Sequence, residues 1–396
     1  MLVNIGIFTD TYFPQVSGVA TSVKTLREQL EQHGHNVYIF TTTDPNVEPN
    51  QYERNIFRFS SIPFISFTDR RIAVRGLFRA YQVARDLELD VVHTQTEFSM
   101  GWIGKFVAKN LKIPCIHTYH TMYEDYLHYV AKGKLLKPYH VKQMSRTFCY
   151  HMTGIVAPSE RVLDTLDRYG IKTPVTVIPT GVDIKKFEDV TADLDLREKY
   201  NFKSDTPMLL TLSRLAYEKN IDRLIDVLPE VLKKIPDVKL LIVGDGPAME
   251  SLKQQVTDLK LESAVIFTGE VDNEEVANYY HTADLFVSTS ISESQGLTYI
   301  EAMASGLRVV ATHSPYTDEL LSDRDFGGTF SNKDELIDKI VFYLDKSKEQ
   351  INQDKLRSKL TSISADNFGE KILQFYADCK ALYGKESETS HSSETG

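Results

Sequence analysis

The 396-residue chain has only three cysteines, one tryptophan and no long hydrophobic run. The cysteines (Cys115, Cys149 and Cys379) are widely spaced and show no metal-ligand pattern, which argues against a disulfide scaffold and fits a reducing compartment. No stretch approaches the roughly 18 apolar residues that span a bilayer. The first residues lack the basic segment of a signal peptide. We therefore expect a cytoplasmic protein, attached peripherally to the inner face of the cell membrane if it meets a membrane at all.

Acidic residues are absent from residue 126 to residue 159, a stretch that holds Lys132, Lys134, Lys137, Lys142 and Arg146. The first half of the chain is also the more basic half. Residues 1–180 carry 20 Lys and Arg against 16 Asp and Glu, a net charge of +4, whereas residues 181–396 carry 25 against 39, a net charge of −14. This asymmetry indicates an anionic partner for the first half only.

A second basic segment places Arg71, Arg75 and Arg79 four residues apart, which predicts one helix face near Leu77 and Phe78. Both segments have the composition of surfaces that lie on anionic membranes, where each charge contributes about 1 kcal/mol. The alternative is a pair of ordinary amphipathic helices packed on a sheet, with solvated basic faces. No recognised nucleic-acid-binding motif accompanies the charge, so nucleic acid is not an expected partner.

Short apolar runs alternate with segments of helical periodicity along both halves. Strands are predicted at residues 3–9, 37–41, 91–93, 115–119 and 155–157, and again at 208–212, 240–243, 265–267, 285–287 and 309–311. Helices are predicted at residues 19–31, 221–234, 249–259, 273–280 and 297–305. This order predicts an α/β protein with two doubly wound domains of mainly parallel sheet and a ligand cleft between them. We place the domains at residues 1–182 and 183–385, with the last helix free to pack back on the first domain, and expect residues 386–396 to be disordered.

Two glutamates follow the predicted strand at residues 285–287. Glu293 lies on the loop after this strand, and Glu301 lies within the next predicted helix, which ends at Gly306. Ligands bind at the carboxyl edge of open α/β sheets, so one carboxylate could hold the hydroxyls of one sugar and the other those of a second. The alternative is two solvated acids near a helix start, favoured by the helix dipole.

Other loops at the same sheet edge carry cations and glycines. Arg214 and Lys219 lie between a strand and a helix, where both could reach a diphosphate. The run Val-Gly-Asp-Gly-Pro at residues 243–247 follows the next strand, and solvated surface charges are the alternative reading of the cations.

In the first half, a loop with Pro14 and Gly18 precedes a helix and could let backbone N–H groups approach a phosphate, although an ordinary loop explains it too. The G-x-G-x-x-G fingerprint is missing, which disfavours a dehydrogenase.

The combination of Arg214, Lys219, the Gly-Asp-Gly run from Gly244, Glu293 and Glu301 resembles the retaining nucleotide-sugar glycosyltransferases of family four, whose GT-B fold has two facing Rossmann-like domains. The match covers nearly the whole ordered chain. The run His-Thr-Tyr-His-Thr-Met-Tyr-Glu-Asp-Tyr at residues 117–126 looks like the bacterial diacylglycerol glucosyltransferases, which make the glycolipids that anchor lipoteichoic acid. The opening run Phe-Thr-Asp-Thr-Tyr-Phe-Pro-Gln-Val-Ser-Gly-Val-Ala-Thr-Ser looks like the same subgroup.

The resemblance implies a UDP-sugar site in the second domain. Arg214 and Lys219 would bind the diphosphate, Glu293 would bind the hydroxyls of the transferred sugar, and Glu301 would hold the ribose. The base would lie near residues 265–268. Further donor-binding residues are expected at Gly244, Gln295 and Gly296.

In the first domain, the resemblance implies that Gly18 approaches the leaving phosphate and that His120 lies at the reacting sugar, where it orients the sugar or stabilises positive charge through its main chain. A strand-end histidine bonded to its neighbours is the alternative. A metal site with His93 and His117 is conceivable, but no acid or cysteine completes a ligand spacing. The GT-B arrangement requires no metal or other cofactor, which leaves a non-essential stimulation by Mg²⁺ open.

This chain departs from many relatives at two places. It has Gln295 where an aromatic residue often precedes the glycine, and Ser17-Gly18 where a pair of glycines is common. Both departures bear on the identity of the sugar more than on the reaction.

The expected activity is retaining transfer of glucose from UDP-glucose to 1,2-diacylglycerol, which gives α-monoglucosyldiacylglycerol. No candidate nucleophile is obvious, which favours a same-face mechanism in which the donor phosphate deprotonates the acceptor. Three alternatives stay open: addition of a second glucose to monoglucosyldiacylglycerol, transfer to a soluble acceptor, and a non-catalytic nucleotide-sugar-binding protein.

Overall fold

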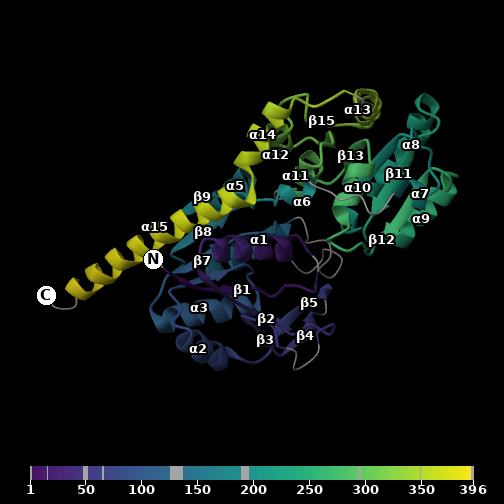
Figure 1. Ribbon diagram of the computed structural model, residues 1–396. Helices are drawn as coiled ribbons and strands as arrows, with labels where there is room; N and C mark the ends of the chain where they lie inside the picture. Colours follow the sequence, from purple (N-terminus) through teal and green to yellow (C-terminus); the bar gives the residue numbers. More distant parts are fainter. Residues whose placement is uncertain are drawn as a thin grey trace. The chain divides into compact units, whose positions relative to one another are not determined.

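A computed structural model describes residues 2–15, 17–47, 52–64, 67–124, 137–188, 196–291, 293, 296–347 and 349–393. The chain divides into two compact units (Figure 1). Unit 1 contains residues 1–181 and 365–396, and unit 2 contains residues 182–364. Among the described residues, no helix combines the length and the apolar character needed to cross a membrane.

Unit 1 is built on a seven-stranded sheet in the order β3-β2-β1-β6-β7-β8-β9, in which every pair of neighbours is parallel. The strands are β1 (Asn4–Phe8), β2 (Asn36–Thr42), β3 (Ile56–Phe59), β6 (Val91–Thr94), β7 (Cys115–Thr118), β8 (Gly154–Ala157) and β9 (Val175–Val177). The connecting helices are α1 (Gly18–Gln32), α2 (Leu77–Asp86), α3 (Ser99–Leu111), α4 (Pro138–Cys149) and α5 (Glu160–Tyr169). The strand order reverses between β1 and β6, which is the place where ligands bind in this type of sheet.

Helices cover both faces of this sheet because its strands are apolar on both faces. In β1, Ile5 and Ile7 pack with α1 and α15 (Ala365–Ser393), whereas Phe8 faces the opposite side, where α2 and α3 pack. Figure 1 shows these two layers of helices on either side of the sheet. The alternation follows from the period of two residues along a strand.

The last helix returns to unit 1. α15 places Phe368, Ile372, Phe375 and Tyr376 in the core beneath β1 and β8. The helix continues to Ser393, so residues 386–393, for which the composition predicts disorder, are helical here. The physical reason is that adding residues to an existing helix costs far less than starting one.

Unit 2 repeats the same topology with a six-stranded parallel sheet in the order β12-β11-β10-β13-β14-β15. The strands are β10 (Met208–Leu212), β11 (Lys239–Val243), β12 (Val265–Gly269), β13 (Leu285–Ser288), β14 (Val309–Thr312) and β15 (Gly327–Phe330). On one face lie α8 (Ile221–Lys234), α9 (Met249–Asp258) and α13 (Lys333–Lys346). On the other lie α6 (Lys185–Glu188), α7 (Leu196–Lys199), α10 (Val276–Thr282), α11 (Leu297–Ala304), α12 (Pro315–Leu320) and α14 (Gln353–Ser362). Two doubly wound parallel sheets confirm the predicted fold class.

The predicted helix face of Arg71, Arg75 and Arg79 is wrong. Arg71 lies on β5 (Phe67–Ala73), which pairs with β4 (Ser61–Phe64) as an antiparallel hairpin, and only Arg79 lies on α2. Arg71 is fixed there because its guanidinium donates to the Ser61 carbonyl and hydroxyl oxygens at 2.7 and 2.8 Å. The Arg71 guanidinium therefore links the two strands of the hairpin.

Candidate functional site

The predicted donor-site residues meet at the carboxyl edge of the sheet in unit 2, where the strand order reverses between β10 and β13. The loop after β10 forms a short 3₁₀ helix, Tyr217–Lys219, and the loop after β13 carries Glu293. Thr289 joins these loops by donating to the Asn220 carbonyl oxygen at 2.7 Å. The topology therefore brings together side chains that lie far apart in the sequence.

Lys219 and Glu293 form an ion pair in which Lys219 Nζ lies 2.6 Å from Glu293 Oε1. The two side chains are 18% and 21% exposed, so the pair is largely but not completely shielded from water. Reduced solvation strengthens such a pair relative to one on an open surface. The cation and the carboxylate are thus held at one place, as ligands of a diphosphate and an adjoining sugar would have to be.

Arg214 is exposed on a loop whose backbone is fixed. Leu215 N donates to the Asp245 carbonyl oxygen at 2.9 Å, and Ala248 N donates to the Leu215 carbonyl oxygen at 2.8 Å. Gly244 has φ +126°, and a Cβ there would lie 2.0 Å from the Ser213 carbonyl oxygen. Glycine at position 244 is therefore required for the close approach of the loops after β10 and β11. This packing fixes the backbone of the loop that carries Arg214.

Glu301 lies on α11, one helix after the Glu293 loop. The helix begins after Gly296, whose left-handed conformation (φ +63°) favours glycine, and whose added Cβ would lie 2.6 Å from the Tyr299 ring. Tyr280 on α10 donates from its hydroxyl to Glu301 Oε2 at 2.8 Å. Burial raises the pKa of Glu301, and this hydrogen bond works in the opposite direction. Tyr280 thus orients a carboxylate whose remaining oxygen can accept hydrogen bonds.

Replacing Tyr280 with phenylalanine should weaken donor binding by about three- to tenfold, the effect of losing one hydrogen bond of about 1 kcal/mol. It should also raise the pKa of Glu301 further, because the hydroxyl that stabilises the ionised carboxylate is removed. Binding that needs the carboxylate should then be lost at a higher pH as the solution is acidified. Calorimetric titration with UDP between pH 5 and 8 measures both effects. If the variant lost UDP affinity at the same pH as the wild type, the expected change in pKa would be contradicted.

Several predicted positions stay untested by geometry. Gln295 lies outside the described residues. Residues 265–268 belong to β12, the edge strand of the sheet, where Thr268 donates to the Gly269 carbonyl oxygen at 2.9 Å. Sequence reasoning missed Tyr316, whose hydroxyl is buried and has no hydrogen-bond partner among the described residues.

In unit 1, Gly18 is the first residue of α1, which is capped by Ser17 Oγ accepting from Ala20 N at 3.1 Å. A Cβ at Gly18 would meet no atom within 4 Å. No neighbouring residue therefore requires glycine at this position, in contrast to Gly244. The N–H groups of a helix start are the donors that a phosphate would approach here.

His120 follows β7 and donates from Nε2 to Gln95 Oε1 at 2.7 Å. Burial, and to a smaller extent the neighbouring His117, lowers the pKa of His120 to about 3. The ring is therefore neutral at physiological pH. Part of the residue stays exposed to solvent, so a ligand could still reach it.

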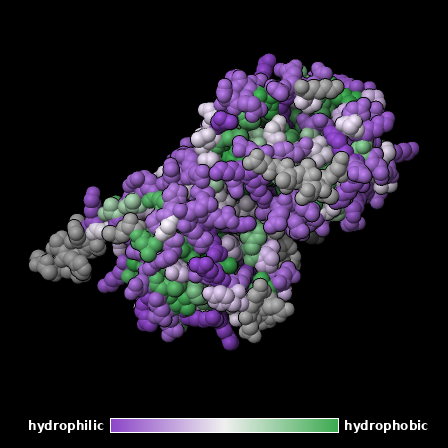
Figure 2. Space-filling view, viewed as in Figure 1, coloured by the Kyte–Doolittle hydropathy of each residue, from purple (hydrophilic) through white to green (hydrophobic). Residues whose placement is uncertain are grey.

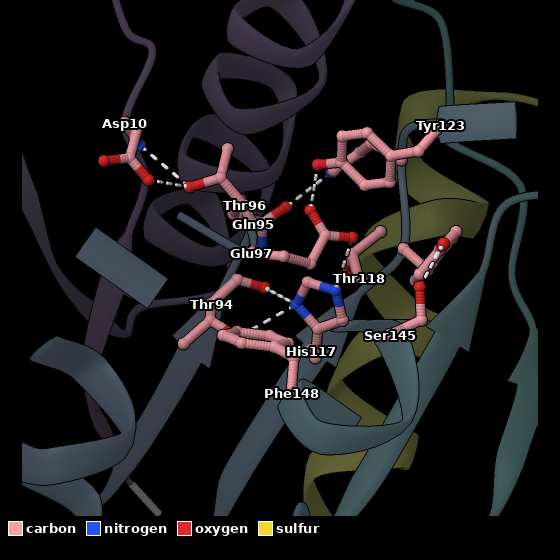
Figure 3. Close-up of polar contacts among 12 residues, drawn as sticks. Asp10, Thr94, Gln95, Thr96, Glu97, His117, Thr118, Tyr123, Ser145 and Phe148 are labelled. Carbon is pink, nitrogen blue, oxygen red and sulfur yellow. Dashed lines mark hydrogen bonds and ion pairs between the residues drawn. The ribbon is translucent and has the colours of Figure 1, made fainter. Parts of the chain in front are cut away.

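A buried polar network surrounds His117 (Figure 3). His117 Nδ1 lies 3.0 Å from the Thr94 carbonyl oxygen and 2.9 Å from the Thr94 hydroxyl oxygen. His117 Nε2 lies 3.2 Å from Glu97 Oε1. Tyr123 donates from its hydroxyl to the other carboxylate oxygen of Glu97. Sequence reasoning missed Glu97, because its partners come from other strands and loops.

Asp10 in the same view has a structural role (Figure 3). Its carboxylate accepts from Thr96 Oγ1 at 2.6 Å, from Ser99 Oγ and from Met100 N at 3.0 Å. It therefore caps the N-terminus of α3 and ties this helix to the loop after β1. Among the described residues, no group of three or more His, Cys, Asp or Glu side chains is arranged to hold a metal ion.

Comparison with known proteins identifies related sequences over nearly the whole chain. Residues 16–186 match the family model described as Glycosyltransferase Family 4, and residues 193–361 match the one described as Glycosyl transferases group 1. The alpha-monoglucosyldiacylglycerol synthase of Streptococcus pneumoniae is 47% identical over 94% of this chain and 85% of its own. The protein of the same name from Acholeplasma laidlawii is 33% identical over 96% of both chains. The solved structure of sucrose-phosphate synthase from Thermosynechococcus elongatus has a TM-score of 0.77 at 21% identity, covers 96% of this chain and 99% of its own, and shares the fold.

Proposed function

Since this chain belongs to glycosyltransferase family 4, we propose that it transfers glucose from UDP-glucose to 1,2-diacylglycerol with retention, giving α-monoglucosyldiacylglycerol. The family resemblance expected from the sequence and the prediction of a glycosyltransferase are both confirmed. The observation that carries the proposed acceptor is the 47% identity to the pneumococcal alpha-monoglucosyldiacylglycerol synthase, which spans most of both chains.

The contacts in unit 2 support a nucleotide-sugar donor. In the proposed reaction, the bond from the anomeric carbon to the UDP oxygen breaks, and a bond to the glycerol hydroxyl forms on the same face. The acceptor proton passes to the departing β-phosphate oxygen. Negative charge builds on UDP as this bond breaks, and Arg214 and Lys219 would stabilise it at the edge of β10. Glu293 would accept from the sugar hydroxyls, and Glu301, oriented by Tyr280, would accept from the ribose.

Exposed aromatic side chains on unit 1 support a membrane-bound acceptor. We name the exposed Phe78 on α2, Trp102 on α3 and Tyr150 after α4, together with the half-buried Phe106 on α3, the aromatic strip. Phe78 is 74% exposed, and its ring centroid lies 6.1 Å from that of Phe106. Figure 2 shows hydrophobic side chains gathered on part of the unit 1 surface. Trp102 and Phe106 were missed by sequence reasoning, because helical spacing does not reveal which face of α3 is left uncovered.

Basic side chains accompany the aromatic strip. Arg75 and Arg79 are exposed beside Phe78, whereas Lys105 Nζ, 4.9 Å from the Trp102 ring centroid, donates to the Phe148 and Tyr150 carbonyl oxygens at 2.6 and 2.8 Å. Each such cation contributes about 1 kcal/mol near an anionic lipid surface. α4 contributes less than its sequence indicates, because Val141 and Phe148 are buried in the core. Residues 125–136, with Lys132 and Lys134, lie outside the described part of the chain.

We propose that the enzyme works peripherally on the inner face of the cell membrane, where its product would enter glycolipid and lipoteichoic acid anchor synthesis.

Replacing Phe78 and Trp102 together with serine should lower partition onto vesicles that contain anionic lipid by about tenfold or more, because two exposed apolar anchors are removed. Flotation of protein with vesicles measures this. Phe342→Ser on α13 is the matched control, since Phe342 and Trp102 are both 44% exposed and Phe342 lies in unit 2. Equal binding of the double variant and the control variant would contradict a contact through the aromatic strip.

An acceptor panel tests the proposed activity. The purified protein is incubated with radiolabelled UDP-glucose, or with other labelled sugar nucleotides, and with vesicles containing diacylglycerol, vesicles containing monoglucosyldiacylglycerol, or a soluble alcohol. We expect label in a monoglucosyl lipid from UDP-glucose and diacylglycerol. Transfer only to the glucosylated lipid would instead identify the second glucosylation step, and transfer only to the alcohol a soluble-acceptor enzyme. UDP binding without transfer would indicate a non-catalytic protein.

A further inference from the structure

Gln95 occupies a position at the reversal of the strand order in unit 1. It follows β6, and its backbone N–H donates to the Phe8 carbonyl oxygen of β1 at 2.8 Å. The neighbouring residues are also fixed: Thr94 bonds to His117 and Thr96 bonds to Asp10. The main chain at Gln95 is therefore fixed, and from it the side chain reaches His120.

The amide of Gln95 is only half satisfied. The residue is 2% exposed, its Oε1 accepts from His120 Nε2, and its Nε2 has no partner among the described residues. A buried donor without a partner destabilises the fold. The bond to His120 through Oε1 is therefore the contact that orients the amide of Gln95.

The hydrogen bond determines what the rest of the His120 ring can do. A carbonyl oxygen only accepts, so Nε2 of His120 carries the proton, and in the neutral ring Nδ1 then has a free lone pair. No other partner of His120 is found among the described residues. His117 and His93 are the titratable groups that interact electrostatically with His120, and neither stabilises a charged His120 ring.

We infer that Gln95 is a positioning residue that holds His120 as the neutral tautomer protonated on Nε2, so that Nδ1 accepts a hydrogen bond from a hydroxyl group of the bound sugar. This rests on the proposed sugar transfer. The role differs from that of a charged histidine, which could only donate.

The tautomer is measured directly on the whole protein by nitrogen-15 NMR of its histidines. His33 and His35 provide internal references: His33 Nδ1 faces the Gln29 carbonyl oxygen and must carry a proton, whereas His35 Nδ1 accepts from Val3 N and must not. We expect the nitrogen-15 resonances of His120 to show no proton on Nδ1, as for His35. Addition of UDP-glucose should shift the His120 Nδ1 resonance, and addition of UDP should not. A proton on Nδ1 of His120 would overturn the inference, and this readout does not depend on the lipid acceptor.

Two variants separate positioning from packing. Gln95→Leu removes the acceptor, so His120 should lose its single tautomer, and kcat should fall by about 10- to 100-fold while the affinity for UDP stays unchanged. Gln95→Glu supplies a carboxylate that favours the charged ring, so activity should be low at neutral pH and recover as pH rises and the ring loses its second proton. Thermal melts of both variants check folding. Wild-type kcat in Gln95→Leu, or activity in Gln95→Glu that does not recover with pH, would overturn the inference.

Discussion

Replacing Arg214 with alanine should lower kcat for glucosyl transfer by about 100-fold or more, the effect of removing one charged donor from a developing negative charge. The side chain is exposed at the edge of β10. The loop itself should keep its shape, because the hydrogen bonds of Leu215 and Ala248 fix its backbone. Steady-state kinetics with radiolabelled UDP-glucose measures the loss.

Two further substitutions define what Arg214 contributes. Arg214→Lys keeps the charge but not the planar pair of donors, so its activity should lie between that of the wild type and that of the alanine variant. Arg223→Ala, which removes an exposed arginine on α8 of the same unit, should leave kcat unchanged. Near-normal turnover of Arg214→Ala would remove this residue from the donor site.

Replacing Lys219 with methionine should lower kcat by about 100-fold or more and also weaken the binding of UDP, because the diphosphate loses a cation. Replacing its partner Glu293 with glutamine should lower transfer by a similar factor but leave UDP affinity close to that of the wild type, since UDP lacks the glucose whose hydroxyls Glu293 would bind. Calorimetric titration with UDP and with UDP-glucose separates the two effects. Both expectations follow from the ion pair at 2.6 Å, which places the two groups side by side.

The double variant Lys219→Met/Glu293→Gln tests whether the pair works as a unit. Residues that act together give non-additive losses, so the double variant should be about as impaired as the worse single variant. If the pair only stabilises the loops after β10 and β13, each single variant should lower the melting temperature and affect UDP and UDP-glucose alike. That pattern would contradict separate roles for the cation and the carboxylate.

The local elements near the donor site could be predicted closely from the sequence. β13 and α11 lie within one residue of the predicted bounds, because a short apolar run followed by a segment free of helix breakers leaves few alternatives. β15 was missed, since its first two residues, Gly327 and Gly328, are poor strand formers, and its short run gives no periodicity. Parallel pairing with β14 stabilises it in the folded protein.

The partners of the site residues could not be predicted. The bond between Tyr280 and Glu301 depends on how α10 packs on α11, and the bond between Gln95 and His120 depends on the spacing of β6 and β7 in the sheet. The helix face predicted for Arg71 failed for a related reason, because a spacing of four residues does not reveal a hairpin. A single sequence carries the periodicity of each element but not the register between them.

Identification of the reaction product tests the proposed glucosyl transfer to diacylglycerol. The lipid made by the purified protein from UDP-glucose and diacylglycerol is isolated, its mass is measured, and the anomeric configuration is determined by proton NMR. We predict one glucose per diacylglycerol in the α configuration. A β-linked product, a lipid with two glucose units as the first product, or release of free glucose without any glycolipid would contradict it.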